Sequence, residues 1–410
     1  MTMQNAPQLP AAGPAGLAPS APAAAALAVV AAATLAIAKL VSPAQALLFL
    51  TGAALGLSLY HAGFGFTYAY RVLMADGRSA GVRAQMVMLG LACILFFPAL
   101  ATGTLFGTPV GGFVVPAGTA VAAGGVIFGI GMQLGGACAS GTLFTTGGGN
   151  VRMAVTLVFF IAGSVIGLEH LPWWLALPAP PAISVVEKLG WPAALAINLG
   201  LFAAIWLIVA RIEKRRHGVL EPIAAAKPGA GGLRRIWTGP WPLLAGAIAL
   251  ALLNFATLYQ AGRPWGITSA FALWGAKIMA VSGFDMSQWA SWASAGQQQA
   301  LRESVLKDVT SVMNFGIMLG AMAAAVLAGK FSPSWRVPLG QVAASVIGGL
   351  MLGYGARLAF GCNIGAFFSG VASGSLHGWM WIVFAMAGNY IGMRLRPVFG
   401  MPVEWGRSAC

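Results

Sequence analysis

Residues 124–141 read GGVIFGIGMQLGGACASG, and residues 348–365 read GGLMLGYGARLAFGCNIG. The two stretches align without a gap at an offset of 224 residues, which predicts that the chain consists of two homologous halves. The identical positions are Gly124, Gly125, Gly129, Gly131, Leu134, Cys138 and Gly141, which correspond to Gly348, Gly349, Gly353, Gly355, Leu358, Cys362 and Gly365. After one inserted residue Gly163 and Gly167 match Gly388 and Gly392, and a weaker match places YHAG (Tyr60 to Gly63) over YQAG (Tyr259 to Gly262).

The composition around this repeat is that of a membrane protein. Of the 410 residues, 59% are hydrophobic and only 8% are charged, whereas a soluble protein has roughly 25% charged residues. These values exclude a soluble globular fold. The net charge of +14 does not indicate nucleic-acid binding, because the basic residues fall between apolar stretches, as the positive-inside rule expects for a protein in a lipid bilayer.

Apolar segments long enough to cross a bilayer, about 20 residues each, recur along the chain. They predict an all-α polytopic membrane protein in which broken and re-entrant short helices meet near the bilayer midplane. Residues 1–23, rich in Ala and Pro, are expected to form a disordered tail. Long crossings are expected at 24–41, 44–60, 84–104, 153–169, 191–210, 240–259, 309–329 and 377–393, and Gly-rich breaks or re-entrant segments at 61–71, 117–150, 260–281 and 338–376.

Charge in the loops predicts how the halves are oriented. The first half spans 24–210, and a basic linker, 211–235, joins it to the second half, 236–396, which a C-terminal tail at 397–410 follows. The linker and the tail are expected in the cytoplasm, and the more acidic loop at 282–308 outside. Corresponding loops then face opposite sides, which predicts two inverted-topology repeats with both termini cytoplasmic. Such repeats commonly hold a substrate site near the midplane, which favours a transporter.

Cys138 and Cys362 are the leading candidates for site residues, because they recur at matching positions in Gly-rich breaks. Packing, a disulfide and a metal pair are the alternatives. Two cysteines without a His, Asp or Glu at ligand spacing make a poor zinc site, so no metal is expected. The neighbouring glycines are expected to let the backbone approach the substrate pathway; they are Gly129, Gly131, Gly353 and Gly355.

A break in a membrane helix exposes backbone N–H groups, which favour an anion. Arg357 indicates the same ligand, because a guanidinium inside a membrane segment is costly and usually functional; snorkelling to the membrane interface is the alternative. Gln133 matches Arg357 in the first half, and Asn363 supplies a neutral donor beside Cys362. A positive entrance is expected from Arg263 and Lys277.

Two second-half stretches, GYGARLAFGCNIGAFFSGVASGSLHGW (353–379) and GRPWGITSAFALWGAK (262–277), resemble the YeeE/YedE family of bacterial sulfur transport proteins. In the first half, FGIGMQLGGACASGTLFTTGGG (128–149) is similar to that family's repeated motif, and the resemblance covers roughly residues 45–400. It implies an inner-membrane protein that takes up an inorganic sulfur anion, most often thiosulfate, through a constriction lined by cysteines. Family members that take up thiosulfate have a further cysteine early in the first half, and this chain has none before Cys93.

The family's chemistry predicts that Cys138 and Cys362 pass the anion between them. Thiols form weak hydrogen bonds with a terminal sulfur, and an apolar site disfavours the thiolate that covalent persulfide exchange requires, so non-covalent passage is expected. The alternative function is a membrane subunit or receptor that delivers or senses sulfur or selenium species for a cytoplasmic partner such as a sulfur-carrier protein. The sequence has no phosphate-binding GxxxxGK[ST] loop and no haem or iron–sulfur spacing, so neither enzyme activity nor a cofactor is expected.

Overall fold

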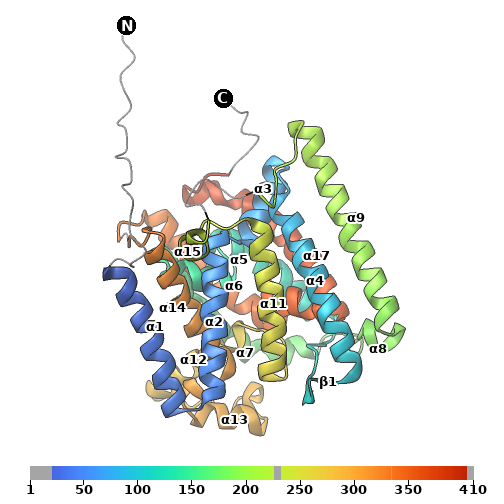
Figure 1. Cartoon of the computed structure of the whole chain (residues 1–410). Coiled ribbons are helices and arrows are strands. Elements are labelled where there is room, and N and C mark those ends of the chain that lie inside the picture. Colours follow the sequence, from blue (N-terminus) through green and yellow to red (C-terminus); the bar gives the residue numbers. More distant parts are fainter. Residues whose placement is uncertain (1–20, 226–231, 334, 404–410) are drawn as a thin grey trace.

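The computed structural model describes residues 21–225, 232–333 and 335–403, which are helical nearly throughout (Figure 1). Nine helical stretches among these residues are long and apolar enough to cross a membrane. The strands described within these ranges are two short ones, β1 (Thr104–Leu105) and β2 (Thr108–Pro109), paired in a hairpin. The expected all-α polytopic membrane architecture is therefore confirmed.

Every crossing expected from the sequence falls on a helix. The last one, α17, is less apolar than the nine stretches because it includes polar residues such as His377 and Asn389. The helices are α1 (Ala21–Leu40), α2 (Pro43–Ala62), α3 (Phe66–Asp76), α4 (Ala80–Thr102), α5 (Thr119–Gly135), α6 (Ala139–Gly147), α7 (Val151–Leu175), α8 (Val185–Leu189), α9 (Trp191–His217), α10 (Arg234–Thr238), α11 (Leu243–Ala261), α12 (Thr268–Val281), α13 (Ala295–Arg302), α14 (Val309–Leu327), α15 (Leu339–Leu358), α16 (Gly370–Ala372) and α17 (Leu376–Leu395), with 3-10 turns η1 (Ala290–Trp292), η2 (Val305–Lys307) and η4 (Arg396–Phe399) and a π-helix, η3 (Asn363–Ser369).

Two expected boundaries differ from the structure. Residues 1–20 of the tail proposed at 1–23 lie outside the described residues. Residues 21–23 belong to α1. The basic linker was expected to begin at residue 211, but α9 continues to His217, so the first residues of the linker extend a membrane helix. Part of the same linker, 226–231, lies outside the described residues.

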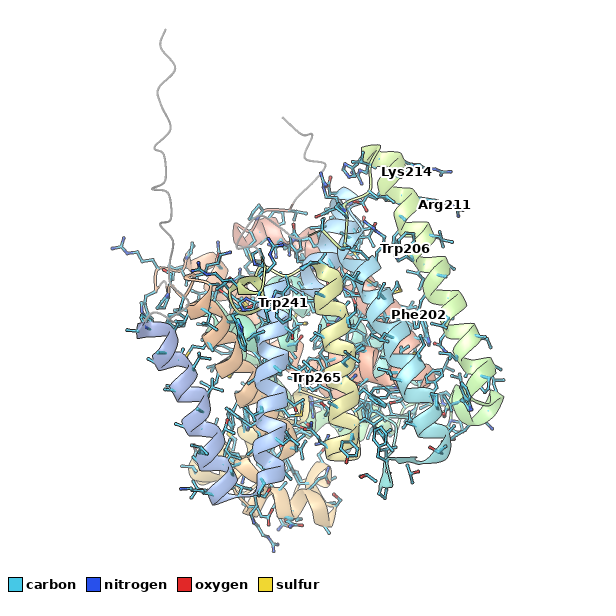
Figure 2. The ribbon with its side chains drawn as sticks, in the orientation of Figure 1. Phe202, Trp206, Arg211, Lys214, Trp241 and Trp265 are labelled. Atoms are coloured by element: carbon cyan, nitrogen blue, oxygen red, sulfur yellow. The ribbon has the colours of Figure 1, made fainter. Side chains whose placement is uncertain are left out.

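The two ends of the helical assembly differ in their loops. The end of α9 that bears Arg211 and Lys214 lies at the top of the view in Figure 2, close to α3 in Figure 1. This end is termed the linker face. The other end holds α8, α13 and the β1 hairpin and is termed the opposite face (Figure 1).

A buried ion pair fixes the end of α9 against the start of α4. Arg83 Nη2 lies 3.1 Å from Glu213 Oε2, and both side chains are buried. The carboxylate also accepts hydrogen bonds from the Ser79 hydroxyl at 2.5 Å and from the backbone N–H of Glu221 at 3.0 Å. Because every oxygen of the buried carboxylate has a donor, the linker is held firmly against α4 as it leaves α9.

Glycines bring the helices of the two halves into backbone contact. A Cβ added at Gly129 would collide with the carbonyl of Ala385 in α17, and one added at Gly353 would collide with the carbonyl of Phe160 in α7. Phe160 corresponds to Ala385 once the one-residue insertion is counted, so the two contacts are equivalent. Such equivalent contacts are what two symmetry-related halves require; the inverted orientation of the repeats stays a prediction.

The same kind of contact joins other helices. Gly131 packs against the backbone of α15 and Gly355 against that of α5, which brings the two broken helices together. On the other side of the assembly, α2 and α14 interlock in the same way. Their contacting glycines are Gly52 and Gly56 of α2, and Gly316 and Gly320 of α14.

Substitution of Gly353 with Ala should destabilise the protein, because the added methyl group has no space between α15 and α7. We expect the free energy of unfolding to fall by about 1–3 kcal/mol, as in other overpacked cores. Thermal unfolding of the detergent-purified protein would measure it as a lower midpoint. Gly200→Ala is the matched control, because a Cβ at Gly200 in α9 meets no neighbouring atom within 4 Å. Equal midpoints for the two variants would contradict the proposed role of Gly353 in packing.

Candidate functional site

Both repeats of the Gly-rich motif break a helix just before the cysteine, as the sequence predicted. In the first half α5 ends and Gly136 takes a left-handed conformation, with φ +92°. In the second half α15 ends before Phe360, whose φ of 55° is unusual for a non-glycine residue. A residue in this region costs on the order of 1–3 kcal/mol, and such strain is found mainly at functional sites. The second break therefore stores strain directly beside Cys362.

Cys138 and Cys362 occupy equivalent places after the two breaks. Cys138 precedes the first residue of α6, and Cys362 precedes the π-helix η3. Both side chains are buried, with 2% and 0% exposed, and both are free thiols. The helices that follow them, α6 and η3, contact each other. The Cys138 sulfur lies 3.3 Å from the Ser140 hydroxyl, and the Cys362 sulfur accepts a 3.4 Å hydrogen bond from the N–H of Ile364. The region of the two thiols is termed the cysteine constriction.

Asn363 adds polar groups to the cysteine constriction. Its side-chain Nδ2 donates a 3.4 Å hydrogen bond to the hydroxyl of Tyr70 in α3, and its Oδ1 is buried without a partner. Tyr70 could not be predicted from the sequence, because an aromatic residue in an apolar segment carries no signal of a contact almost 300 residues away.

A cavity of about 440 Å³ leads from the opposite face toward Cys362. Arg357 lines it together with Gly361, the residue before Cys362, is half-buried, and has no partner for its Nε. Arg263 lines it as well and donates a 3.1 Å hydrogen bond to the Thr310 hydroxyl. No acidic residue is among the described residues that line this cavity, so its potential is positive.

A second cavity, of about 460 Å³, is lined by the loop that joins α6 to α7 and by residues that follow α14 on the linker face. The latter are Lys330, Ser332, Arg336, Val337, Pro338 and Gln341. Its charged residues are all basic: Arg152, Lys330 and Arg336. The Arg152 guanidinium lies against Gly136, in the break that precedes Cys138. Arg152 is a site residue that the sequence did not reveal, because it lies just before the crossing expected at 153–169.

The remaining predicted residues lie outside both cavities. Gln133 is buried and donates hydrogen bonds to the Thr67 carbonyl at 3.2 Å and to Asn389 Oδ1 at 2.8 Å, so it fastens α3 to α5 and α17. Lys277 donates hydrogen bonds to the carbonyls of Leu301 and Glu303 and thereby holds the end of α13. It does not line the entrance that was expected from its charge. Gly129, Gly131, Gly353 and Gly355 pack helices together, as described above, and their role along a pathway stays a prediction.

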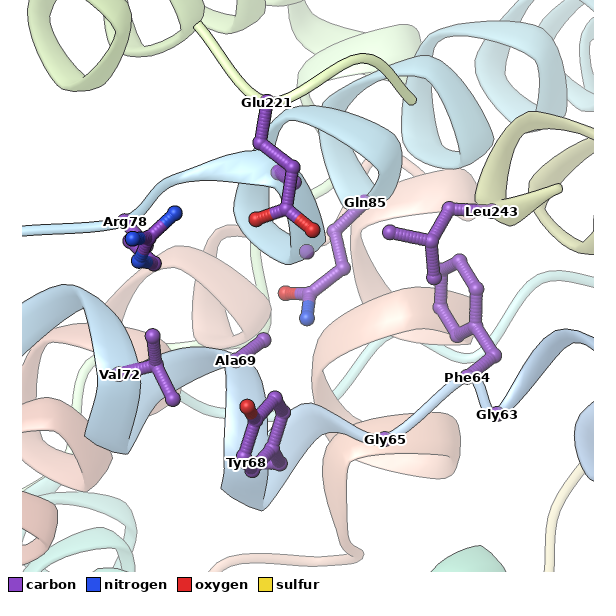
Figure 3. A pocket seen from close by; sticks show the side chains of 12 residues that line it. Gly63, Phe64, Gly65, Tyr68, Ala69, Val72, Arg78, Gln85, Glu221 and Leu243 are labelled. Carbon is purple, nitrogen blue, oxygen red and sulfur yellow. The ribbon is translucent and has the colours of Figure 1, made fainter. Parts of the chain in front are cut away.

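A third cavity, of about 130 Å³, lies near the linker face between α3 and α4 (Figure 3). Gln85 and Glu221 extend into it from two sides, above Tyr68 (Figure 3). None of the described residues that line it comes from either break, and its one basic residue, Arg78, is paired with Asp76 at 2.9 Å. This cavity therefore has neither the charge nor the position of the other two.

Comparison with known proteins agrees with this geometry. Residues 61–391 match the protein family described as Sulphur transport. The chain belongs to this family. It is 31% identical over 169 residues to a protein of Escherichia coli (strain K12) named "Probable transporter YedE", and the match covers 40% of each chain.

Longer matches are found to two proteins named "Thiosulfate transporter TsuA". The chain is 28% identical over 280 residues to that of Spirochaeta thermophila, which covers 65% of this chain and 74% of the relative. It is 24% identical over 355 residues to that of Escherichia coli (strain K12), which covers 82% and 90%. The resemblance seen in the sequence motifs is thus confirmed at the level of the family.

Arg357→Gln should weaken anion binding in the cavity on the opposite face, because it removes a positive charge from the lining of that cavity beside Gly361. We expect the dissociation constant for thiosulfate to rise about tenfold, the scale of one hydrogen bond to a charged group. Titration calorimetry on the purified protein would measure it. Lys188→Gln on exposed α8 removes the same charge from the same face outside the cavity and should leave binding unchanged. Equal binding by both variants would refute the role of Arg357.

Proposed function

We propose that this protein takes up an inorganic sulfur anion, with thiosulfate as the leading substrate, across the bacterial inner membrane, as a transporter and not as an enzyme. One observation carries the proposal. Two cavities lined by basic residues, with no acidic residue among those described, flank a buried pair of thiols from opposite faces. Membership of the Sulphur transport family supports the class of substrate.

The charges suit an anion that enters at one face and leaves at the other. Arg263 and Arg357 raise the local concentration of anions in the first cavity, because a positive potential in a low-dielectric recess attracts them. The cysteine constriction itself offers neutral donors, so the anion is held weakly there. Weak binding at the narrowest point allows release, which conduction requires. Arg152 then attracts the anion toward the linker-face cavity.

Thiosulfate fits this arrangement of donors. Its oxygens resemble those of sulfate and suit the guanidinium groups of the cavities. Its terminal sulfur is softer and suits the polarizable thiols of Cys138 and Cys362. The anion would pass from one thiol to the other by exchanging hydrogen bonds, with no covalent bond formed or broken.

The proposal includes an orientation. The linker face would be cytoplasmic, with both termini on that side, because Arg211, Lys214 and their neighbours crowd it. The two halves would then be inverted repeats related by an axis in the membrane plane. A cytoplasmic sulfur-carrier protein is the expected recipient of the anion at this face.

Uptake of radiolabelled thiosulfate by liposomes that contain only the purified protein tests the proposal. Label should enter liposomes that contain the intact protein faster than protein-free liposomes, whereas Cys138→Ser and Cys362→Ser should each lower the rate about fivefold or more, because a hydroxyl is a poorer partner for sulfur.

Cys93→Ala is the matched control, since Cys93 is a buried free thiol in the continuous helix α4 and not in a break. Wild-type rates in both serine variants would show that the thiols do not carry the anion. No uptake by the intact protein would overturn the transporter and favour a subunit that hands sulfur to a partner.

A further inference from the structure

Tyr70 lies beside the cysteine constriction, on α3, a helix at the linker face (Figure 1). Its side chain is 2% exposed, and its hydroxyl meets Asn363, the residue after Cys362, from the second half. A buried aromatic side chain from a linker-face helix thus reaches the break that holds Cys362.

The hydroxyl of Tyr70 has a proton to give. With the Asn363 amide oriented so that Nδ2 faces the phenol, the hydroxyl accepts this hydrogen bond, and no hydrogen bond from its own proton is formed among the described residues. A phenol both donates and accepts, and a buried donor without an acceptor is destabilising. An anion beside Cys138 would supply the missing acceptor.

The ring of Tyr70 is held in place. Its T-shaped contact with Phe66 has a centroid distance of 6.3 Å, and Gln133 fixes the start of α3 through the carbonyl of Thr67. The side chain of Tyr70 is therefore held rigidly beside the cysteine constriction.

The opposite face is more open beside the constriction. A cavity of about 440 Å³ on that face reaches Gly361 and Gly365, on either side of Cys362. The small side chain of Ser269 also lines it and bonds to Thr310 at 3.1 Å. The buried ring of Tyr70, by contrast, lies against Asn363.

We propose that Tyr70 closes the cysteine constriction toward the linker face and donates a hydrogen bond to the passing anion, so that it determines which anions pass. This inference rests on the proposed function. A hydroxyl donor selects an anion that has an acceptor at the right place, and the ring excludes hydrated anions too large to pass beside it.

Uptake of labelled thiosulfate and labelled sulfate by liposomes containing wild type, Tyr70→Phe or Tyr70→Ala tests selection. Tyr70→Phe keeps the ring and the fold but removes the donor, so thiosulfate uptake should fall about tenfold while sulfate stays excluded. Tyr70→Ala should admit sulfate. Tyr259→Phe is the control, because this exposed hydroxyl, at the end of α11, lines neither cavity. Wild-type uptake and selectivity in both Tyr70 variants would overturn the inference and leave the proposed function intact.

Closure is tested without transport. A membrane-impermeant methanethiosulfonate reagent is applied to the linker face, and mass spectrometry identifies the labelled cysteine. Cys138 should be protected in wild type and in Tyr70→Phe, and labelled in Tyr70→Ala. Labelling of Cys138 in wild type, or its continued protection in Tyr70→Ala, would overturn closure by Tyr70. This result stands even if the intact protein takes up no thiosulfate, which would count against the proposed function alone.

Discussion

Unwound backbone at membrane depth is tolerated only where protein encloses it, because lipid offers no hydrogen bonds to free N–H and carbonyl groups. Both breaks depend on such enclosure. Gly131 and Gly355 set α5 and α15 in backbone contact, so each break is covered by the partner half. The site therefore exists only in the assembled pair of halves, since neither half alone encloses its own cysteine.

The two halves share equivalent helix breaks, so the side chains that differ between them indicate where their chemistry differs. Arg357 lines a cavity beside Gly361, the residue before Cys362. Its counterpart Gln133 instead donates a hydrogen bond to the Thr67 carbonyl and so holds α3 in place. The repeated backbone provides two equivalent breaks, and the unequal side chains around them give the two ends of the assembly distinct chemistry.

Much of the fold was predictable from the sequence, because hydropathy and glycine spacing are local signals. The crossings, both breaks and the positions of the two cysteines followed from them. Arg357 was identified by its charge, which is conspicuous in an apolar segment. The glycines lie at helix contacts, where a backbone approaches each missing Cβ, and their expected role along a pathway stays a prediction.

The residues that were missed depend on distant partners. Tyr70 gains its significance from Asn363 in the other half, and Arg152 from its position against Gly136. Neither contact leaves a periodic or compositional trace, because the residue types involved are ordinary at their own positions. Lys277 shows the converse: its charge suggested an entrance, but its ammonium group donates hydrogen bonds to two neighbouring carbonyls.

The glycine contacts also bear on how such a chain diverges. A close contact between a glycine and the backbone of a neighbouring helix depends on the path of the backbone. It does not depend on which side chains surround it. Most positions of α5, α7, α15 and α17 are thus free to drift in evolution while the contact persists. Proteins with 24% identity, such as this chain and the Escherichia coli TsuA, can share such a contact and still differ in the side chains that set specificity.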